Sequence, residues 1–188
     1  MASSPDHAPA PAPDHVARIQ ADWARERPAL DVSPQGVIGR LHRLAAALTQ
    51  ELVSVYRRHG LGEGEFDVLA ALRRAGAPYE RAPGELAQFT MVTTGAMSKR
   101  LDRLVEAGLV TRRISERDAR ARVVALTEQG LTVIDRAFTE HMANEHRLLE
   151  GLSPIEIQTL EAILTTWLGR FETPRPAERT PGEQGLSA

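Results

Sequence analysis

No cysteine occurs among the 188 residues of the chain, which excludes disulfides, thiolate metal sites and thiol-based redox sensing. No apolar run approaches the ~20 residues that a membrane-spanning helix needs. Residues 1–13 are rich in alanine and proline, whereas a signal peptide would be basic and then apolar. We therefore expect a cytoplasmic protein with no membrane segment.

Motifs of catalysis and metal binding are lacking as well. The chain has no glycine-rich phosphate loop and no Gly-x-Ser-x-Gly motif, and its glycines fall at the ends of expected helices. His141 and His146 are five residues apart, so they do not share a helical face. His42 and His59 have no partner at the spacing of metal ligands. We expect neither an enzyme nor a zinc sensor, and no cofactor.

Charge is unevenly distributed along the chain. The formal net charge of −2 is unusual for a protein that must neutralise phosphates. The segment from Ala96 to Arg122, however, holds eight basic and four acidic residues, so the remainder of the chain carries −6. One basic surface on an acidic body is typical of a protein that approaches DNA from one side, although a solvated arginine-rich surface would give the same pattern.

The hydrophobic pattern predicts one domain with helical extensions. Hydrophobic residues make up 42% of the chain, enough for a core, and they recur at helical spacing with one short stretch of strand-like alternation. We expect a disordered tail over residues 1–14, N-terminal helices over 15–59, a DNA-binding domain over 60–127, C-terminal helices over 128–172 and a disordered tail over 173–188.

The central segment has the element order of a winged helix-turn-helix. Two helices separated by a tight turn precede two strands joined by a charged loop, at residues 83–89, 94–107, 109–114 and 122–126. Alternation places Val110 and Ile114 on the same face of the first strand, available to pack on the helices. The predicted fold is mainly α with a small β-hairpin wing and with N- and C-terminal dimerisation helices.

Two helix start signals follow the wing. Thr127 fits the N-cap of a long helix, and Ser153-Pro154-Ile155-Glu156 forms a capping box that opens another. The second helix then repeats apolar residues at the period of a seam between helices: Ile157, Leu160, Leu164, Trp167 and Phe171. We expect these helices to form a homodimer interface, with packing inside one subunit as the alternative.

The helix over residues 94–107 fits a recognition helix. At 100° per residue, four apolar residues share the face that must meet the core: Met97, Leu101, Leu104 and Val105. The opposite arc is short and polar: Gly95, Lys99 and Asp102, with Ser98 and Arg103 at its edges. An ordinary amphipathic helix is the alternative, but the order of the flanking elements favours DNA reading.

The start of this helix and the wing loop both favour DNA contact. Free N–H groups at a helix N-terminus can hold a phosphate. In the wing loop, Arg117 and Arg120 bracket Asp118, an arrangement that can orient an arginine for a narrow minor groove, with a solvated charge cluster as the alternative. The residues expected to contact duplex DNA are Thr93, Thr94, Gly95, Ser98, Lys99, Arg103, Arg117 and Arg120.

Three motifs in this region are distinctive: Gly108-Leu109-Val110-Thr111-Arg112-Arg113, Glu116-Arg117-Asp118-Ala119-Arg120 and Val124-Ala125-Leu126-Thr127-Glu128-Gln129-Gly130. They resemble the MarR family of multiple antibiotic resistance regulators, over about residues 41–171. The chain departs from the family over residues 119–121, where many members have a further arginine. The resemblance implies a homodimer with interlocking terminal helices, whose two winged domains bind a pseudo-palindromic operator in double-stranded DNA.

An added helix near the N-terminus, residues 19–25, is similar to the urate-responsive branch of that family. The ligand set that this resemblance implies is Trp23, Asp67, Arg100 and Arg112. Arg100 lies between the core face and the outward arc, so it can point back into the protein and hold an anion with Arg112. The alternatives are that Trp23 only packs the added helix, and that Arg100 and Asp67 form a structural ion pair.

Together these features predict a transcription regulator, acting as a repressor, that leaves its operator when a small anionic aromatic ligand such as urate binds and draws Arg100 inward. A phenolic or other aromatic acid is the alternative ligand. A DNA-binding accessory protein that responds to no ligand is the alternative function.

Overall fold

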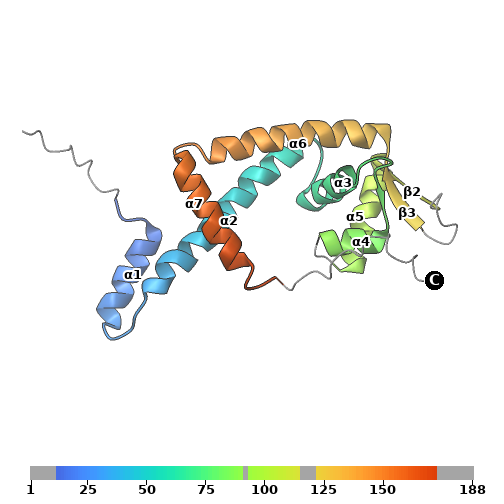
Figure 1. Cartoon of the computed structure of the whole chain (residues 1–188). Coiled ribbons are helices and arrows are strands. Elements are labelled where there is room, and N and C mark those ends of the chain that lie inside the picture. Colours follow the sequence, from blue (N-terminus) through green and yellow to red (C-terminus); the bar gives the residue numbers. More distant parts are fainter. Residues whose placement is uncertain (1–11, 91–92, 115–121, 173–188) are drawn as a thin grey trace, which may run out of the picture. The chain divides into compact units, whose positions relative to one another are not determined.

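The computed structural model describes residues 12–90, 93–114 and 122–172 (Figure 1). The chain divides into two compact units, residues 1–148 and 149–188. The described elements of the first unit are α1 (His15–Glu26), α2 (Ser33–Arg58), α3 (Glu63–Arg74), β1 (Glu80–Arg81), α4 (Pro83–Phe89), α5 (Thr94–Glu106), β2 (Val110–Ile114), β3 (Arg122–Leu126) and α6 (Glu128–Leu148). The predicted mainly helical fold with a small antiparallel sheet is confirmed.

The sheet has three strands in the order β1-β3-β2, all antiparallel. The predicted hairpin is thus extended by β1, whose two residues are too few to show alternation in the sequence. The central strand β3 is buried at Val123, Val124 and Ala125. The expectation that Ile114 packs on the helices is wrong: its side chain is 62% exposed, because it ends the edge strand β2.

The core of the winged domain draws on all of its helices and on the strands β2 and β3. Its fully buried side chains include Val68, Leu69 and Leu72 of α3, Leu86 of α4, Met97, Leu101 and Leu104 of α5, and Val110 and Val124 of the strands. Three of the four residues predicted for the inner face of α5 are therefore confirmed. The fourth, Val105, is 41% exposed, because it follows Leu104 by 100° around the helix and lies at the edge of that face.

The start of α6 ties the sheet to the helices. Thr127 caps α6 as predicted, since its Oγ1 accepts from the N–H of Gly130 at 2.9 Å and donates to the carbonyl of Gly108 at 2.8 Å. Gly130 packs so closely on the residue before β2 that a Cβ there would overlap the carbonyl oxygen of Leu109. This close approach requires a glycine.

The helix α1 packs against the N-terminal part of α2 (Figure 1). Val16 is buried against Gly39, and Asp14 caps α1 and binds the Arg40 guanidinium at 2.7 Å. Asp14, which the sequence analysis includes in the expected tail over residues 1–14, is therefore part of the start of α1. Residues 1–11 and the tail expected over 173–188 lie outside the described residues.

The described part of the second unit is built on α7 (Pro154–Leu168). Its predicted capping box is present: the N–H of Ser153 donates to the Glu156 carboxylate at 2.8 Å, and the N–H of Glu156 donates to Oγ of Ser153 at 3.4 Å. No residue of α7 is buried. In the parts of the chain that the structure describes, no helix combines the length and the apolar character needed to cross a membrane.

Candidate functional site

The N-terminal half of α5 is exposed on its outward face. Oγ1 of Thr93 caps the helix by accepting from the N–H of Ala96 at 3.3 Å. The polar residues predicted for the outward arc are exposed at Gly95, Ser98 and Lys99. This surface suits contact with phosphates and base edges. Arg117 and Arg120 of the predicted wing, and the side chain of Thr94, lie outside the described residues.

One flank of α5 faces α3, and Arg103 lies on that flank. Its Nε and Nη2 lie 2.7 and 2.5 Å from Oε1 of Glu65, a carboxylate that is only 15% exposed. The sequence predicts Arg103 as a DNA contact at the edge of the outward arc. In this structure it ties the recognition helix to α3.

Arg100 points toward the same flank. Its guanidinium lies against Gly64 at the start of α3, where any side chain would overlap it, and it interacts electrostatically with Asp67. Nη1 of Arg100 is buried and has no hydrogen-bond partner among the described residues. Because a buried N–H without an acceptor is unfavourable, this flank offers a donor to an incoming anion. Two of the four predicted ligand residues, Arg100 and Asp67, are thus brought together.

The charge on this flank is only partly balanced. Burial raises the pKa of Asp67, and the neighbouring carboxylate of Glu63 raises it further, whereas Arg100 acts in the opposite direction. Burial therefore outweighs the attraction of the guanidinium. When Asp67 takes up a proton, it no longer offsets the positive charge of Arg100.

A cluster that the sequence analysis missed lies beside Asp67. Tyr56 stacks on Phe66 with ring centroids 3.9 Å apart, and its hydroxyl lies 3.3 Å from Nδ1 of His141. Nε2 of His141 lies 3.1 Å from the Glu145 carboxylate. Burial, together with the charge of Asp67, raises the pKa of Tyr56 to about 12, so its hydroxyl keeps its proton and can donate to His141.

The sequence holds little signal for this cluster. Tyr56, Phe66 and His141 lie at inward positions of three different helices, where aromatic side chains are typical of a core. Only the four-residue spacing of His141 and Glu145 indicates a polar pair. No group of three or more histidine, aspartate or glutamate side chains in the described ranges is arranged to bind a metal ion.

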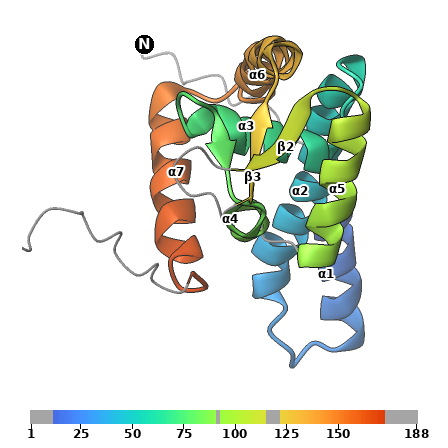
Figure 2. The ribbon, with the colours of Figure 1, turned by 90° about the vertical axis from the view of Figure 1, so that its right-hand side faces the viewer.

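The other flank of α5 faces β2, which follows it in the chain and packs beside it (Figure 2). Nη2 of Arg112 lies 2.7 Å from Oδ1 of Asp102 and 3.3 Å from the carbonyl oxygen of Ser98. Asp102 follows Arg100 by two residues, or about 200° around the helix, so these two side chains lie on opposite flanks. The structure therefore does not bring Arg112 to Arg100 and Asp67.

Trp23 lies at the opposite end of α2 from Asp67. It is 46% exposed and lines a shallow pocket of about 380 Å³ with Gln35 and residues between α1 and α2. The stretch of α2 from Gln35 to Tyr56 is about 30 Å long at 1.5 Å per residue, and Tyr56 is the residue that contacts α3. Within one chain, Trp23 is therefore remote from Arg100.

Comparison with known proteins agrees with this architecture. Residues 59–121 match the model of the MarR family. The chain is 39% identical over 157 residues to the HTH-type transcriptional regulator PecS of Dickeya dadantii. This alignment covers 84% of this chain and 92% of PecS. AbsC, a MarR family transcriptional regulator from Streptomyces coelicolor, has a similar fold, with 24% identity and a TM-score of 0.68 over 76% of this chain and 96% of AbsC.

A second solved structure is a mutant MarR from E. coli in complex with operator DNA, with 27% identity and a TM-score of 0.62 over 74% of this chain and 99% of that chain. The region that matches the family model begins before α3 and reaches into the wing, so it includes the exposed recognition helix. The alignment with PecS extends well beyond this region. The chain therefore belongs to the MarR family of DNA-binding transcriptional regulators.

Proposed function

We propose that the chain is a homodimeric repressor that binds a pseudo-palindromic operator in the cytoplasm and releases it when a small anionic aromatic ligand of the urate type binds beside Arg100. Two-fold symmetry would place the two recognition helices about one turn of DNA apart. The proposed DNA contacts are Thr93, Thr94, Gly95, Ser98 and Lys99 on α5, with Arg117 and Arg120 of the wing.

The observation that carries the ligand proposal is the buried and unpaired Nη1 of Arg100. A planar anion can accept hydrogen bonds from adjacent N–H groups of a guanidinium, which makes arginine the preferred partner of such ligands. Burial raises the pKa of Asp67, so its carboxyl takes up a proton at a higher pH than an exposed aspartate does, which lessens its repulsion of an anion as the pH falls. Arg100 and Asp67 thus form the charged part of the proposed site.

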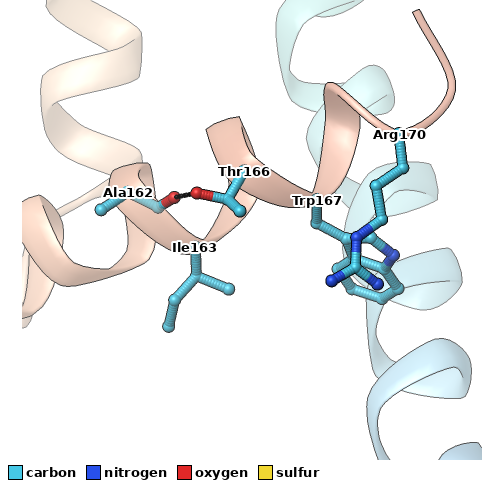
Figure 3. A pocket seen from close by; sticks show the side chains of 5 residues that line it. All are labelled: Ala162, Ile163, Thr166, Trp167 and Arg170. Carbon is cyan, nitrogen blue, oxygen red and sulfur yellow. Dashed lines mark hydrogen bonds between the residues drawn. The ribbon is translucent and has the colours of Figure 1, made fainter.

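Exposed apolar side chains support the dimer. The large apolar residues that the single chain leaves exposed include Val37, Ile38 and Leu44 of α2 and Ile155, Leu160, Ile163, Leu164 and Leu168 of α7. Figure 3 shows Ile163 and Trp167 of α7, and Arg170 just after this helix, lining a shallow pocket. Because large apolar side chains outside the DNA-binding domain favour an interaction surface, we assign both helices to contact with a second copy.

Trp23 enters the proposed site from that second copy. About 30 Å of α2 separates the end of the helix that lies beside Trp23 from the end that contacts α3 in the same chain. In a dimer formed through α2 and α7, the α1 helix of one subunit can approach α3 and α5 of the other. The site is then complete only in the dimer, with the tryptophan ring stacked on the aromatic ligand.

Ligand binding would act on DNA through α5. Arg100 and the outward arc belong to one rigid helix, so a shift of the guanidinium toward the ligand moves the surface that meets the operator. A coupling free energy of about 1–3 kcal/mol, typical of allosteric pairs, would weaken operator binding roughly 5- to 150-fold.

Calorimetric titration with urate tests the ligand site. We expect the wild-type protein and Lys99→Ala to bind urate, and Arg100→Ala to lose binding while retaining affinity for a duplex that the wild-type protein selects from a randomised pool. Lys99→Ala is the matched control, because Lys99 neighbours Arg100 but is exposed on the outward arc. If the wild type binds salicylate and not urate, the site stands with a phenolic acid as its ligand. Urate binding that survives in Arg100→Ala would contradict the proposal.

Mixed dimers test the origin of Trp23. Neither Trp23→Ala nor Arg100→Ala homodimers should bind urate. If Trp23 serves the partner's site, a heterodimer of the two variants regains one intact site, and titration gives half the wild-type stoichiometry. If Trp23 serves its own subunit, the heterodimer stays inactive.

A further inference from the structure

The outward arc of α5 carries charges of both signs. Lys99 is its basic residue and Asp102 its acidic residue, and Glu106 follows Asp102 at four-residue spacing on the same side of the helix. The basic residue at the edge of the arc, Arg103, is engaged by Glu65. Asp102 is 62% exposed at its side chain, so it faces the solvent from which DNA approaches. A free carboxylate at this place would repel phosphates and weaken binding to any duplex.

Arg112 provides the missing positive charge from the neighbouring strand. Nη2 of Arg112 lies 2.7 Å from the Asp102 carboxylate and 3.3 Å from the carbonyl oxygen of Ser98. One guanidinium group therefore contacts two successive turns of α5 and neutralises the acid between Lys99 and Glu106. Its backbone is fixed in the sheet, where Arg112 pairs with Val124 of the central strand.

We propose that Arg112 is a positioning residue for DNA binding: it neutralises Asp102 on the DNA-facing arc and fastens the wing strand to the recognition helix. The wing and the helix then meet the duplex in one fixed relation. This role places Arg112 on the opposite flank of α5 from Arg100 and leaves it outside the ligand site. It depends on the DNA-binding activity alone and does not require the proposed ligand.

Exposure of the pair makes the proposal testable without unfolding the protein. The side chains of Arg112 and Asp102 are 44% and 62% exposed, and ion pairs this exposed contribute little to folding stability. Replacing either residue should therefore leave the thermal midpoint nearly unchanged. The effect on DNA should be larger, because the operator carries a dense row of negative charges.

The test compares Arg112→Ala, Asp102→Asn and the double variant in the full-length protein. A labelled duplex that the wild type selects from a randomised pool is titrated by fluorescence anisotropy at several salt concentrations. We expect Arg112→Ala to weaken binding roughly tenfold at low salt, because the Asp102 carboxylate is then no longer neutralised and repels the phosphates. Asp102→Asn should bind at least as tightly as the wild type, because it removes a carboxylate from the DNA-facing arc and leaves the positive charge of Arg112 unbalanced, and the double variant should recover most of the loss.

If Arg112 contacted phosphate directly, adding Asp102→Asn would not restore the operator affinity that Arg112→Ala loses. Recovery of affinity in the double variant therefore distinguishes the proposed role from a direct contact. If the double variant binds as weakly as Arg112→Ala, Arg112 itself contacts phosphate or only supports the fold, and the proposal fails. It also fails if Arg112→Ala keeps full operator affinity and loses only its response to urate. Arg112→Lys should retain part of the affinity, because an ammonium group can neutralise Asp102 but holds the carbonyl of Ser98 less well.

Discussion

The two flanks of α5 use arginine in opposite directions. On the α3 flank the helix supplies the arginines, and α3 supplies the acids: Arg103 binds Glu65, and Arg100 lies beside Asp67. On the β2 flank the helix supplies the acid, Asp102, and the strand supplies the arginine. The recognition helix is therefore held from both sides by charge, and on its α3 side Arg100 retains a buried donor that has no partner among the described residues.

The basic segment from Ala96 to Arg122 presents less positive charge to DNA than its sequence suggests. Part of the positive charge counted between Ala96 and Arg122 is engaged inside the protein, since Arg113 also binds Glu80 of β1. The net basic count therefore overstates the charge that α5 presents to DNA. Both flanks rest on the same core. The contribution of each flank to stability and operator binding can be measured by substituting first a core residue and then a residue of each flank.

Removing the shared core should have the largest effect. Leu104→Ala deletes a side chain that is 1% exposed beneath both flanks. We expect it to lower the free energy of unfolding by about 2–5 kcal/mol, the usual range for a buried leucine, and to weaken operator binding strongly. Urea denaturation and anisotropy titration measure the two effects.

Val105→Ala is the matched control for Leu104→Ala. Val105 is the neighbouring residue but is 41% exposed, so its loss should lower the free energy of unfolding by less than about 1 kcal/mol. Equal losses in the two variants would mean that the core does not lie where the structure places it.

Breaking the α3 flank alone should have an intermediate effect. Glu65→Gln removes the carboxylate that holds Arg103, and we expect the free energy of unfolding to fall by about 1 kcal/mol, because one partner is shielded and the other is exposed. Operator affinity should not fall, since Arg103 becomes free to approach phosphates.

Asp102→Asn on the opposite flank provides the comparison for Glu65→Gln. It should change stability less, because both members of its ion pair are exposed. A loss of operator affinity in Glu65→Gln at unchanged stability would show that the α3 flank also contributes directly to DNA binding.

Local signals made most of the helices predictable. Pro83 and the capping box at Ser153 mark where α4 and α7 begin, and both starts are as expected. The strand β1 was missed because it consists of two residues whose pairing with β3 depends on tertiary contacts. Val105 and Ile114 were misplaced because periodicity identifies a face but not where that face ends.

The candidate site was predictable only in part. Helical periodicity places Arg100 on a flank of α5, and the family resemblance pairs it with Asp67. Neither the periodicity nor the resemblance indicates on which flank of α5 the strand β2 packs. The position of β2 determines that Arg112 binds Asp102. Nor does a single sequence show that about 30 Å of helix separates Trp23 from the other ligand residues within one chain.

The smallest effect concerns the charge of the α3 flank. Burial raises the pKa of Asp67, so the folded protein holds this proton more tightly than the unfolded chain does. The stability that results is fully present below the unfolded pKa and is lost as the pH rises through the folded value. As the pH falls from neutral, the wild type should therefore gain stability relative to Asp67→Asn, measured by urea denaturation at each pH.

A second aspartate supplies a control of opposite sign. The backbone N–H of Ser33 lowers the pKa of Asp31, so the wild type should lose stability relative to Asp31→Asn as the pH falls. If both variants responded to pH in the same direction, burial would not control the charge of Asp67. The carboxyl beside Arg100 would then take up its proton no more readily than an exposed aspartate, and lowering the pH would not ease the approach of an anion to this flank any earlier than at an exposed site.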